Sequence, residues 1–158
     1  MSLISVKAYL QDFNRFDIME FKQSSATVEE AASTIGVNPD VIAKTVAFYD
    51  ESQEHALIIV TSGLAKISSG KFKRQFGFKP HMIAFDQVED YTGHQPGGVC
   101  PFANPHGAKI YLDVSLKRYP WVYPACGSSN SAIKVTIEEL ETYVCNLQWV
   151  DLAQTDNN

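Results

Sequence analysis

The sequence predicts a single domain of the mixed α/β (α+β) class, with a mixed, curved sheet wrapped by helices. The chain has 158 residues, which is within the usual range of one domain. Helical and strand-like patterns alternate along it, and several strand-like runs are too close together for a crossover helix between them. Neither a GxGxxG motif nor a P-loop sequence is present, so we do not expect a doubly wound nucleotide-binding fold.

Local capping signals define the elements of the first half. Thr27 with Glu30 forms a capping-box pair, and Gly36 supplies the stop of that helix. Asn38 followed by Pro39 is typical of a second helix start. In order, we expect a helix over 5–13, a strand over 16–21, a helix over 27–35, a short helix from 38, and a hairpin of strands over 44–49 and 56–61.

The second half contains a long irregular segment between regular elements. Residues 92–107 are rich in glycine and proline, and loops of this length in a compact domain are usually functional or disordered. Asp86 with Glu89 and Thr136 with Glu139 are further cap signals. We expect helices over 69–76, 86–91 and 136–145, strands over 81–85, 109–112, 121–123 and 133–135, and a short helical turn before 121.

We assign residues 1–150 to the domain and residues 151–158 to a polar, disordered C-terminal tail. No run approaches the roughly 20 apolar residues of a membrane span, and the N-terminus lacks a signal-peptide pattern. Three cysteines without CxxC spacing favour reduced thiols in a cytoplasmic protein over a disulfide framework or a zinc site.

The charge distribution contains one basic stretch in an acidic protein. The net charge is −5, but residues 55–85 hold no acid and five basic residues. Such a patch suits a partner with a few phosphates, and it is equally typical of a solvated helix face. All charged residues after Ile137 are acidic, so we expect that segment to lie away from any phosphate.

Two local features are candidates for chemistry. Lys44 lies in an apolar strand-like run, where an ammonium needs a partner, a solvated cleft or an exposed end. Gly97 and Gly98 in the long loop would let backbone N–H groups approach a ligand or hold an oxyanion. We expect both glycines to adopt dihedrals that other residues avoid, and a side chain at Gly98 to fill the pocket.

The sequence gives weaker support for two other kinds of site. A thiol hydrolase could use Cys100, His94 and Asp113, but chance supplies such trios in most chains. The histidines are scattered without metal-ligand spacing, so we expect no metal site.

In order along the chain, these pieces resemble the free-standing aminoacyl-tRNA editing domains of the YbaK/ProX type, which are related to the editing insertion of bacterial prolyl-tRNA synthetase. The resemblance covers residues 28–140. The matching pieces are Thr27–Ala32, Gly36–Val37, Ile42–Thr45, Thr92–Gly93, Gly97–Phe102, Leu112–Asp113 and Ala125–Asn130.

The resemblance implies hydrolysis of the ester between a wrong amino acid and tRNA, without metal, cofactor or cysteine nucleophile. It ties activity to Lys44, and it gives the loop Gly97–Pro101 the contacts with the aminoacyl group and terminal adenosine. His94 falls where an aromatic pocket wall is usual. Members that remove cysteine carry an aspartate where this chain has Ala132, so the cognate amino acid stays open.

The resulting assignments group residues by role. We expect Lys44, Gly97 and Gly98 to be catalytic, with backbone N–H groups of residues 97–99 holding the ester carbonyl. Expected substrate contacts are His94, Val99, Cys100, Pro101, Gly127, Ser129 and Asn130. Expected tRNA phosphate contacts are Lys66, Lys71, Lys73 and Arg74.

The expected partners are the acceptor end of a mischarged tRNA and an aminoacyl-tRNA synthetase, without DNA or membrane. Two alternatives to the editing enzyme remain. One is a non-catalytic paralogue that binds a nucleotide or a partner synthetase with the same pocket. The other is the hydrolase that depends on Cys100.

Overall fold

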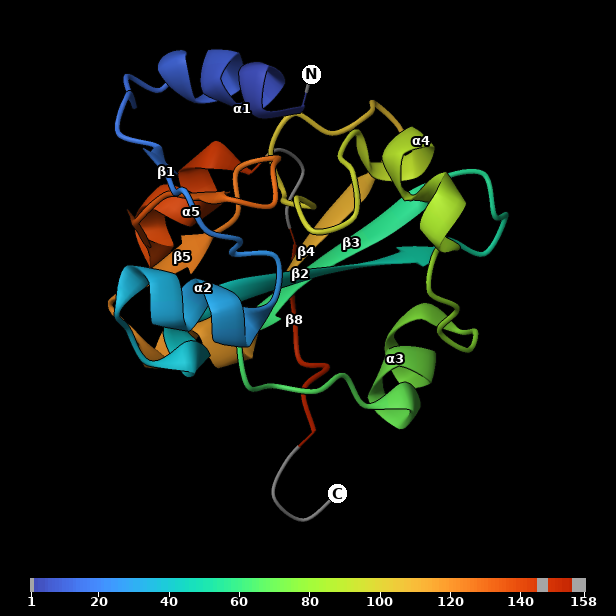
Figure 1. The fold of residues 1–158 in the computed structure, drawn as a ribbon. Coiled ribbons are helices and arrows are strands. Elements are labelled where there is room, and N and C mark those ends of the chain that lie inside the picture. Colours follow the sequence, from blue (N-terminus) through green and yellow to red (C-terminus); the bar gives the residue numbers. More distant parts are fainter. Residues whose placement is uncertain (1, 145–147, 155–158) are drawn as a thin grey trace.

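A six-stranded mixed sheet organises the molecule, which was analysed as a computed structural model describing residues 2–144 and 148–154 (Figure 1). The α-helices are α1 (Ser2–Gln11), α2 (Val28–Ile35), α3 (Ser69–Phe76), α4 (Val88–Thr92) and α5 (Ile137–Tyr143). The 3-10 helices are η1 (Pro39–Val41), η2 (Phe85–Gln87) and η3 (Val114–Arg118). The strands are β1 (Met19–Glu20), β2 (Ile42–Tyr49), β3 (Ala56–Ser62), β4 (Lys109–Asp113), β5 (Trp121–Pro124), β6 (Ser131–Ala132), β7 (Val135–Thr136) and β8 (Gln148–Val150).

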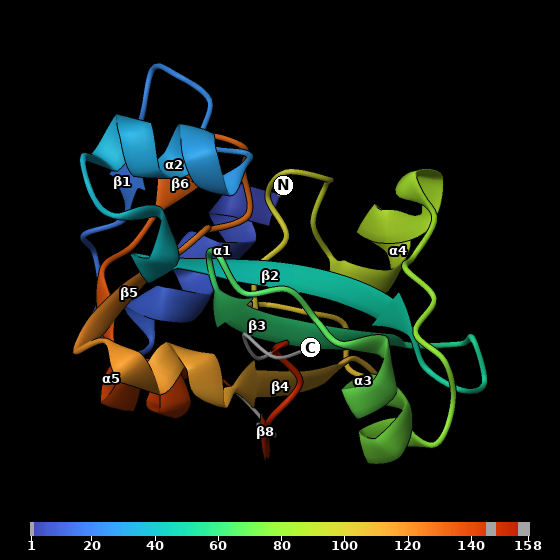
Figure 2. The same cartoon turned by 90° about the horizontal axis from the view of Figure 1, so that it is seen from below.

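The main sheet has the order β7-β5-β2-β3-β4-β8, and β1 pairs with β6 in a separate two-stranded ladder. β2 and β3 form an antiparallel hairpin, whereas β2–β5, β3–β4 and β4–β8 are parallel. The sheet is therefore mixed, as predicted. Viewed from below, β1 and β6 lie beside α2, and β2 of the main sheet passes next to them (Figure 2). No helix among the described residues is long and apolar enough to span a membrane.

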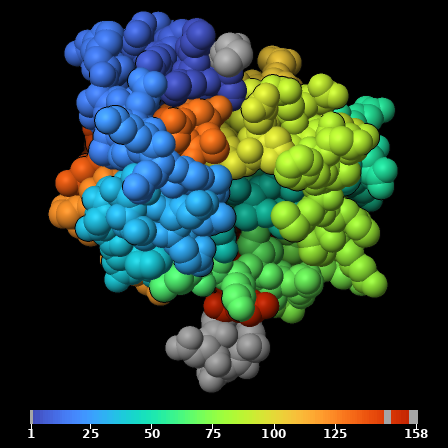
Figure 3. Space-filling model, viewed as in Figure 1, coloured from blue at the N-terminus to red at the C-terminus, as the bar shows by residue number. Residues whose placement is uncertain are grey.

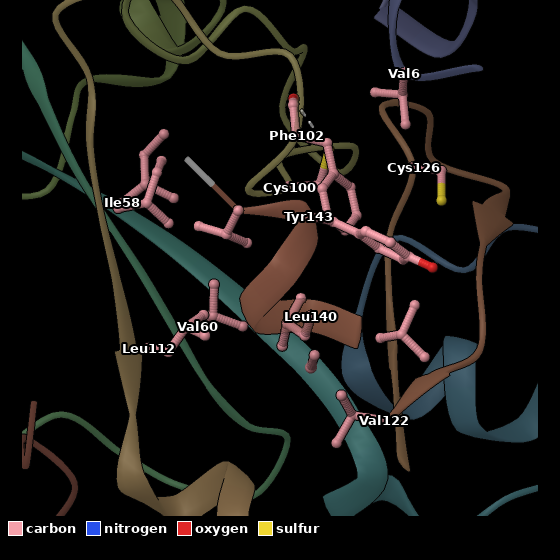
Figure 4. Packing of buried hydrophobic residues seen from close by; sticks show 14 of the residues in the cluster. Val6, Ile58, Val60, Cys100, Phe102, Leu112, Val122, Cys126, Leu140 and Tyr143 are labelled. Atoms are coloured by element: carbon pink, nitrogen blue, oxygen red, sulfur yellow. Dashed lines mark hydrogen bonds between the residues drawn. The ribbon is translucent and has the colours of Figure 1, made fainter. Parts of the chain in front are cut away.

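The core divides between the two faces of the hairpin. Every residue of β3 is buried, so this strand is the centre of the protein. One cluster places Val60, Leu112 and Leu140 with Phe102 of the long loop (Figure 4). A second cluster packs the aromatic ring of Phe72 in α3 against Phe48 of β2 and other apolar residues. At roughly 1.5–3 kcal/mol per buried large side chain, these clusters supply most of the driving force for folding.

The predicted helices are confirmed where a cap is formed by residues that are close together in the sequence. The Thr27 side chain accepts a hydrogen bond from the Glu30 N–H, and Gly36 ends α2 at φ 85°. Asn38 caps η1, and Thr136 with Glu139 forms a complete capping box at α5. The first helix starts and ends earlier than expected, and the first strand is only two residues long.

Two predicted strands and one predicted helix cap are wrong. Residues 81–85 form no strand of the sheet; a single bridge joins Met82 to Phe48. The cap signal at Asp86 is not used, because this residue lies within η2 and α4 starts at Val88. The strand expected over 133–135 is split into β6 and β7. The expected end of the last helix at Cys145 lies outside the described residues.

The C-terminal segment is fastened to the sheet, contrary to the expected tail from residue 151. The buried Asp113 carboxylate accepts the N–H of Leu152 at 2.6 Å, and the Leu152 side chain is fully buried. The Gln154 N–H donates to the Lys66 carbonyl oxygen at 2.7 Å. Residues 151–154 therefore belong to the domain, while residues 155–158 of the predicted tail lie outside the described residues.

We expect Leu152→Ala to lower the free energy of unfolding by roughly 2–5 kcal/mol, because it leaves a cavity beside Phe72 in the second core cluster. Gln154→Ala, which truncates an exposed side chain in the same segment, is the matched control and should change it by less than about 0.5 kcal/mol. Urea denaturation measures both. Equal stability of the two variants would contradict a packed C-terminal segment.

Candidate functional site

A small cavity lies between α2, the start of β2, the β5–β6 turn and the long loop. Its volume is about 150 Å³. Figure 3 shows a hollow at this place, with β2 in teal at its floor, α2 on one side and the loops around residues 98 and 128 above it. The lining residues are Ser25, Ala26, Thr27, Val28, Ala31, Ile42, Ala43, Lys44, Thr45, Gly97, Val99, Tyr123, Ala125, Ser131 and Ala132.

The cavity exists because the outer edge of β2 loses its partner. β5 pairs with β2 only as far as Ala43 and then turns away, with Ala125 bridging to Ala132. Pairing resumes where the Ile83 N–H donates to the Ala47 carbonyl oxygen at 3.2 Å. Alternate strand residues direct their backbone groups to the same side. Thr45 therefore faces the gap, and no backbone bond across it joins Thr45 to another described residue.

Lys44 lines the cavity with its ammonium half-buried. Its neighbour Ala43 packs into the core. The Lys44 Nζ donates a hydrogen bond to the carbonyl oxygen of Ala65. Burial lowers the pKa of this ammonium, an effect that the Glu29 carboxylate opposes and the Lys66 ammonium increases. Lys44 is therefore one of the residues that line this small cavity, and its catalytic role stays a prediction.

Gly97 and Val99 bring the long loop to the cavity. Gly97 has φ 91°, where glycine is favoured, and a Cβ there would lie 3.2 Å from the Cβ of Ala26. The loop thus reaches the N-terminal side of α2 only because this residue has no side chain.

Gly98 differs from its expected role. Its φ is not left-handed, and its N–H donates to the Gln95 carbonyl oxygen at 3.0 Å, so that donor is already used. A Cβ at Gly98 would lie 2.6 Å from the backbone carbon of Gly127. A side chain there would push apart two loops rather than fill the cavity.

The segment 127–130 fastens the cavity walls without lining the cavity. Ser25 donates its N–H to the Ser129 carbonyl oxygen at 2.6 Å. The Asn130 side chain donates to the Phe21 carbonyl oxygen at 2.8 Å. Gly127 has φ 94° and lies against the first turn of α1. These three predicted contacts therefore position the neighbouring residues Ser131 and Ala132, which do line the cavity.

His94 and Cys100 are buried away from the cavity, so their expected contacts with substrate are wrong. The His94 ring bonds to Ser2 Oγ at 2.9 Å and to the Phe102 carbonyl oxygen at 2.7 Å. Burial lowers the pKa of this imidazole. Burial also raises the pKa of the Cys100 thiol to about 12, so it carries no thiolate near neutral pH.

Asp113 and Pro101, which were also considered for a site around this loop, lie elsewhere. Asp113 binds the backbone N–H groups of Ser115 and Leu152, so no Cys-His-Asp arrangement forms. Pro101 is buried and lines a different cavity beside Tyr9.

Only part of the basic stretch is exposed and free of a carboxylate partner. Lys66, Lys73 and Arg74 are exposed, whereas Lys71 binds the Asp151 carboxylate at 3.2 Å and the Ala153 carbonyl oxygen at 2.8 Å. The acidic C-terminal segment thus touches the basic stretch, contrary to expectation. Lys73 and Arg74 also lie in the last turn of α3, where cations stabilise the helix dipole.

Sequence reasoning missed most of the cavity walls. No role was assigned to Val28, Ala31, Thr45 or Ala125, although each lies within a piece of the family resemblance. Ser25 and Tyr123 lie outside those pieces. One feature of the sequence could have pointed to Thr45. It follows Lys44 directly in the strand, so its side chain lies on the opposite face from that of Lys44.

Comparisons with known proteins agree on one family. A family model described as an aminoacyl-tRNA editing domain matches residues 22–143. The chain is 47% identical over 155 residues to the uncharacterized protein YwhH of Bacillus subtilis (strain 168), covering 98% of each chain. A crystal structure of "a putative trans-editing enzyme for prolyl tRNA synthetase" superposes with a TM-score of 0.87 at 28% identity, covering 98% of both chains.

The fold also matches the crystal structure of the hypothetical protein APE2540. The TM-score is 0.84 at 22% identity, with 95% of this chain and 99% of the other covered. At this identity the match speaks for the fold alone.

We expect Gly98→Ala to lower the free energy of unfolding by roughly 1–3 kcal/mol, because the added Cβ meets the backbone of Gly127 and Ser128 at 2.6 and 2.7 Å. Gly70→Ala is the control: its Cβ meets nothing nearer than 3.8 Å, and in the helix α3 it should stabilise by up to about 1 kcal/mol. Thermal unfolding measures both. A Gly98 variant as stable as the parent would show that the two loops separate freely.

Proposed function

The chain belongs to the aminoacyl-tRNA editing domain family, and on that premise we propose that it is a trans-editing hydrolase that deacylates a mischarged aminoacyl-tRNA. The observation that carries this proposal is the cavity in which Lys44 and the backbone of Gly97 and Val99 meet. A cation beside a backbone-lined pocket fits the end of a charged tRNA, which offers phosphate oxygens and an ester carbonyl. Such substrates are available in the cytoplasm, where we place the activity.

The proposed reaction is hydrolysis of one ester bond. Water adds to the ester carbonyl, the bond from that carbon to the ribose oxygen breaks, and the products are a free amino acid and a tRNA with a free 3' hydroxyl. The backbone N–H groups of Gly97 and Val99 would hold the carbonyl oxygen as it becomes negative. A donor of this kind contributes roughly 3–4 kcal/mol to lowering the barrier in other enzymes.

Lys44 supplies the charge at the mouth of the pocket. Its half-buried ammonium would bind a ribose or phosphate oxygen of the terminal nucleotide and hold the ester over the loop. Because burial already disfavours the charged form, a negatively polarised ligand relieves part of that cost. Neither Cys100 nor Cys126 takes part, since both are fully buried and neither lines the cavity.

The cavity sorts the amino acid by size. At about 150 Å³ it is smaller than the roughly 300–1,000 Å³ of drug-sized pockets, and the side chains of Ala31, Ala125 and Ala132 contribute to its walls. A single methylene gives only about 1–3 kcal/mol of discrimination. A synthetase that accepts a slightly smaller amino acid therefore needs a second, smaller sieve, and this protein would act on the charged tRNA alone or beside that synthetase.

We expect Lys44→Met to abolish deacylation of mischarged tRNA while leaving the thermal midpoint unchanged or higher, because it removes a half-buried charge but keeps the aliphatic stem. Cys100→Ala is the control and should keep its activity per folded molecule. A panel of mischarged tRNAs, assayed for ester loss, measures both. Activity that survives in the Lys44 variant but not in the Cys100 variant would favour the thiol hydrolase, and a wild type that binds but cleaves nothing would favour the non-catalytic paralogue.

We expect charge reversal at Lys73 and Arg74 to raise KM for charged tRNA several-fold with little change in kcat, because phosphate contacts contribute binding rather than chemistry. Lys117→Glu, at another exposed lysine, is the control for net charge. Steady-state kinetics at two salt concentrations measure both. An equal effect of the two changes, or binding that does not depend on salt, would assign α3 to a solvated surface.

A further inference from the structure

One buried hydroxyl, on a residue that lines the cavity, has no partner. Thr45 Oγ1 is covered from solvent, and it is the one buried side-chain polar atom among the described residues without a hydrogen bond. Leaving such an atom unpaired costs stability, typically about 1–3 kcal/mol for the buried group. Native proteins keep few of these atoms, so each needs an explanation outside the unliganded fold.

The other serine and threonine hydroxyls around the cavity are already engaged. Ser25 Oγ donates to the Ser129 carbonyl oxygen at 3.4 Å, and Ser131 Oγ bonds to Ser128 Oγ at 2.6 Å. The Thr27 hydroxyl accepts the Glu30 N–H at 3.1 Å as the cap of α2. Thr45 differs from all three, because its side chain lines the cavity and fastens nothing.

Its place in the sheet gives a second, independent reason to expect a ligand there. Thr45 lies in the gap between the two partners of the β2 edge, so its backbone faces the same empty space as the cavity. Side-chain and backbone polar groups of one residue thus converge where the proposed aminoacyl group would bind. Because Oγ1 has no partner, a change of the χ1 rotamer that turned it toward a ligand would break no existing hydrogen bond.

Resting on the proposed function, we infer that Thr45 selects the aminoacyl side chain and that the preferred substrate carries a small side chain with a hydroxyl group, as in a seryl ester. A hydroxyl both donates and accepts, so it pairs with Oγ1 in either direction. The cavity volume of about 150 Å³ limits the side chain to a small one.

Charge argues against an acidic side chain at this position. Lys44 is the one charged residue among those that line the cavity. Because it neighbours Thr45 in a strand, its side chain lies on the opposite face of the sheet. A carboxylate beside Thr45 would therefore be desolvated without a cation in contact, which is costly.

The test compares Thr45→Val, which keeps the shape and removes the hydroxyl, with Thr45→Ser, which keeps the hydroxyl. The probes are tRNAs charged with serine or alanine, together with amide-linked seryl- and alanyl-adenosine, which bind but are not hydrolysed. We expect the wild type to prefer the seryl forms. Thr45→Val should weaken seryl binding and cleavage roughly tenfold and leave the alanyl values unchanged, while Thr45→Ser should restore the preference.

Thermal unfolding separates this role from a structural one. Thr45→Val should leave the midpoint unchanged or higher, because the lost hydroxyl has no partner in the fold. The matched control is Thr61→Val, whose buried hydroxyl donates to the Ser62 carbonyl oxygen at 3.0 Å; it should lower the midpoint and leave the seryl-to-alanyl ratio intact.

Each outcome decides between the two proposals. Equal losses for seryl and alanyl forms, no loss for either, or a lower midpoint in Thr45→Val would overturn the role of Thr45 even if tRNA esters are cleaved. A seryl preference in binding that depends on Thr45, without ester cleavage, would overturn the hydrolase and keep the role of Thr45. Absence of both binding and cleavage would overturn both.

Discussion

The unpaired length of β2 is the constraint on which the site depends. β5 follows β2 for two residues, to Ala43, and then leaves toward β6, so three residues pass before the strand regains a partner at Ala47. Unpaired backbone inside a protein is costly, and this stretch is tolerated because a cavity lies against it. Lys44 and Thr45 occupy the gap, one on each face of the strand, and α2 and the long loop enclose the space in front of them.

The residues that looked chemical in the sequence mostly hold the walls of this space in position. His94 joins α1 to the long loop through Ser2 and the Phe102 carbonyl oxygen. Asn130 joins the turn after β5 to the segment preceding α2 through Phe21. The Ser2–His94 and Phe21–Asn130 bonds connect parts of the chain that are 92 and 109 residues apart, and they hold the segments around the cavity together. Preorganisation of this kind is what a backbone-built oxyanion site requires, because its donors cannot move to meet the substrate.

The sequence predicts the helices whose caps are formed by nearby residues. It predicts the site only where a residue type is unusual for its surroundings. The capping box at Thr136 and the glycine stop at Gly36 depend on neighbours a few residues away, so both helices could be anticipated. Lys44 was detectable because a cation in an apolar run is unusual. Gly97 and Gly98 cannot be told apart in the sequence, because only tertiary contacts distinguish them. Gly97 lies next to the start of α2, and Gly98 lies against Gly127. The contribution of Ala31 and Thr45 to the cavity also depends on packing between distant segments.

The division of the cavity into a floor and walls has an evolutionary consequence. The proposed chemistry needs Lys44 and loop backbone, whereas Ala31, Ala125 and Ala132 belong to the walls and contribute only volume. A mutation that adds or removes a methyl group at a wall leaves the cation and the donors untouched. Descendants of one ancestral chain can therefore exchange one amino acid for another by drift at a few wall positions. On the proposed function, overall sequence identity then tracks the shared chemistry, and the wall residues determine which amino acid each lineage removes.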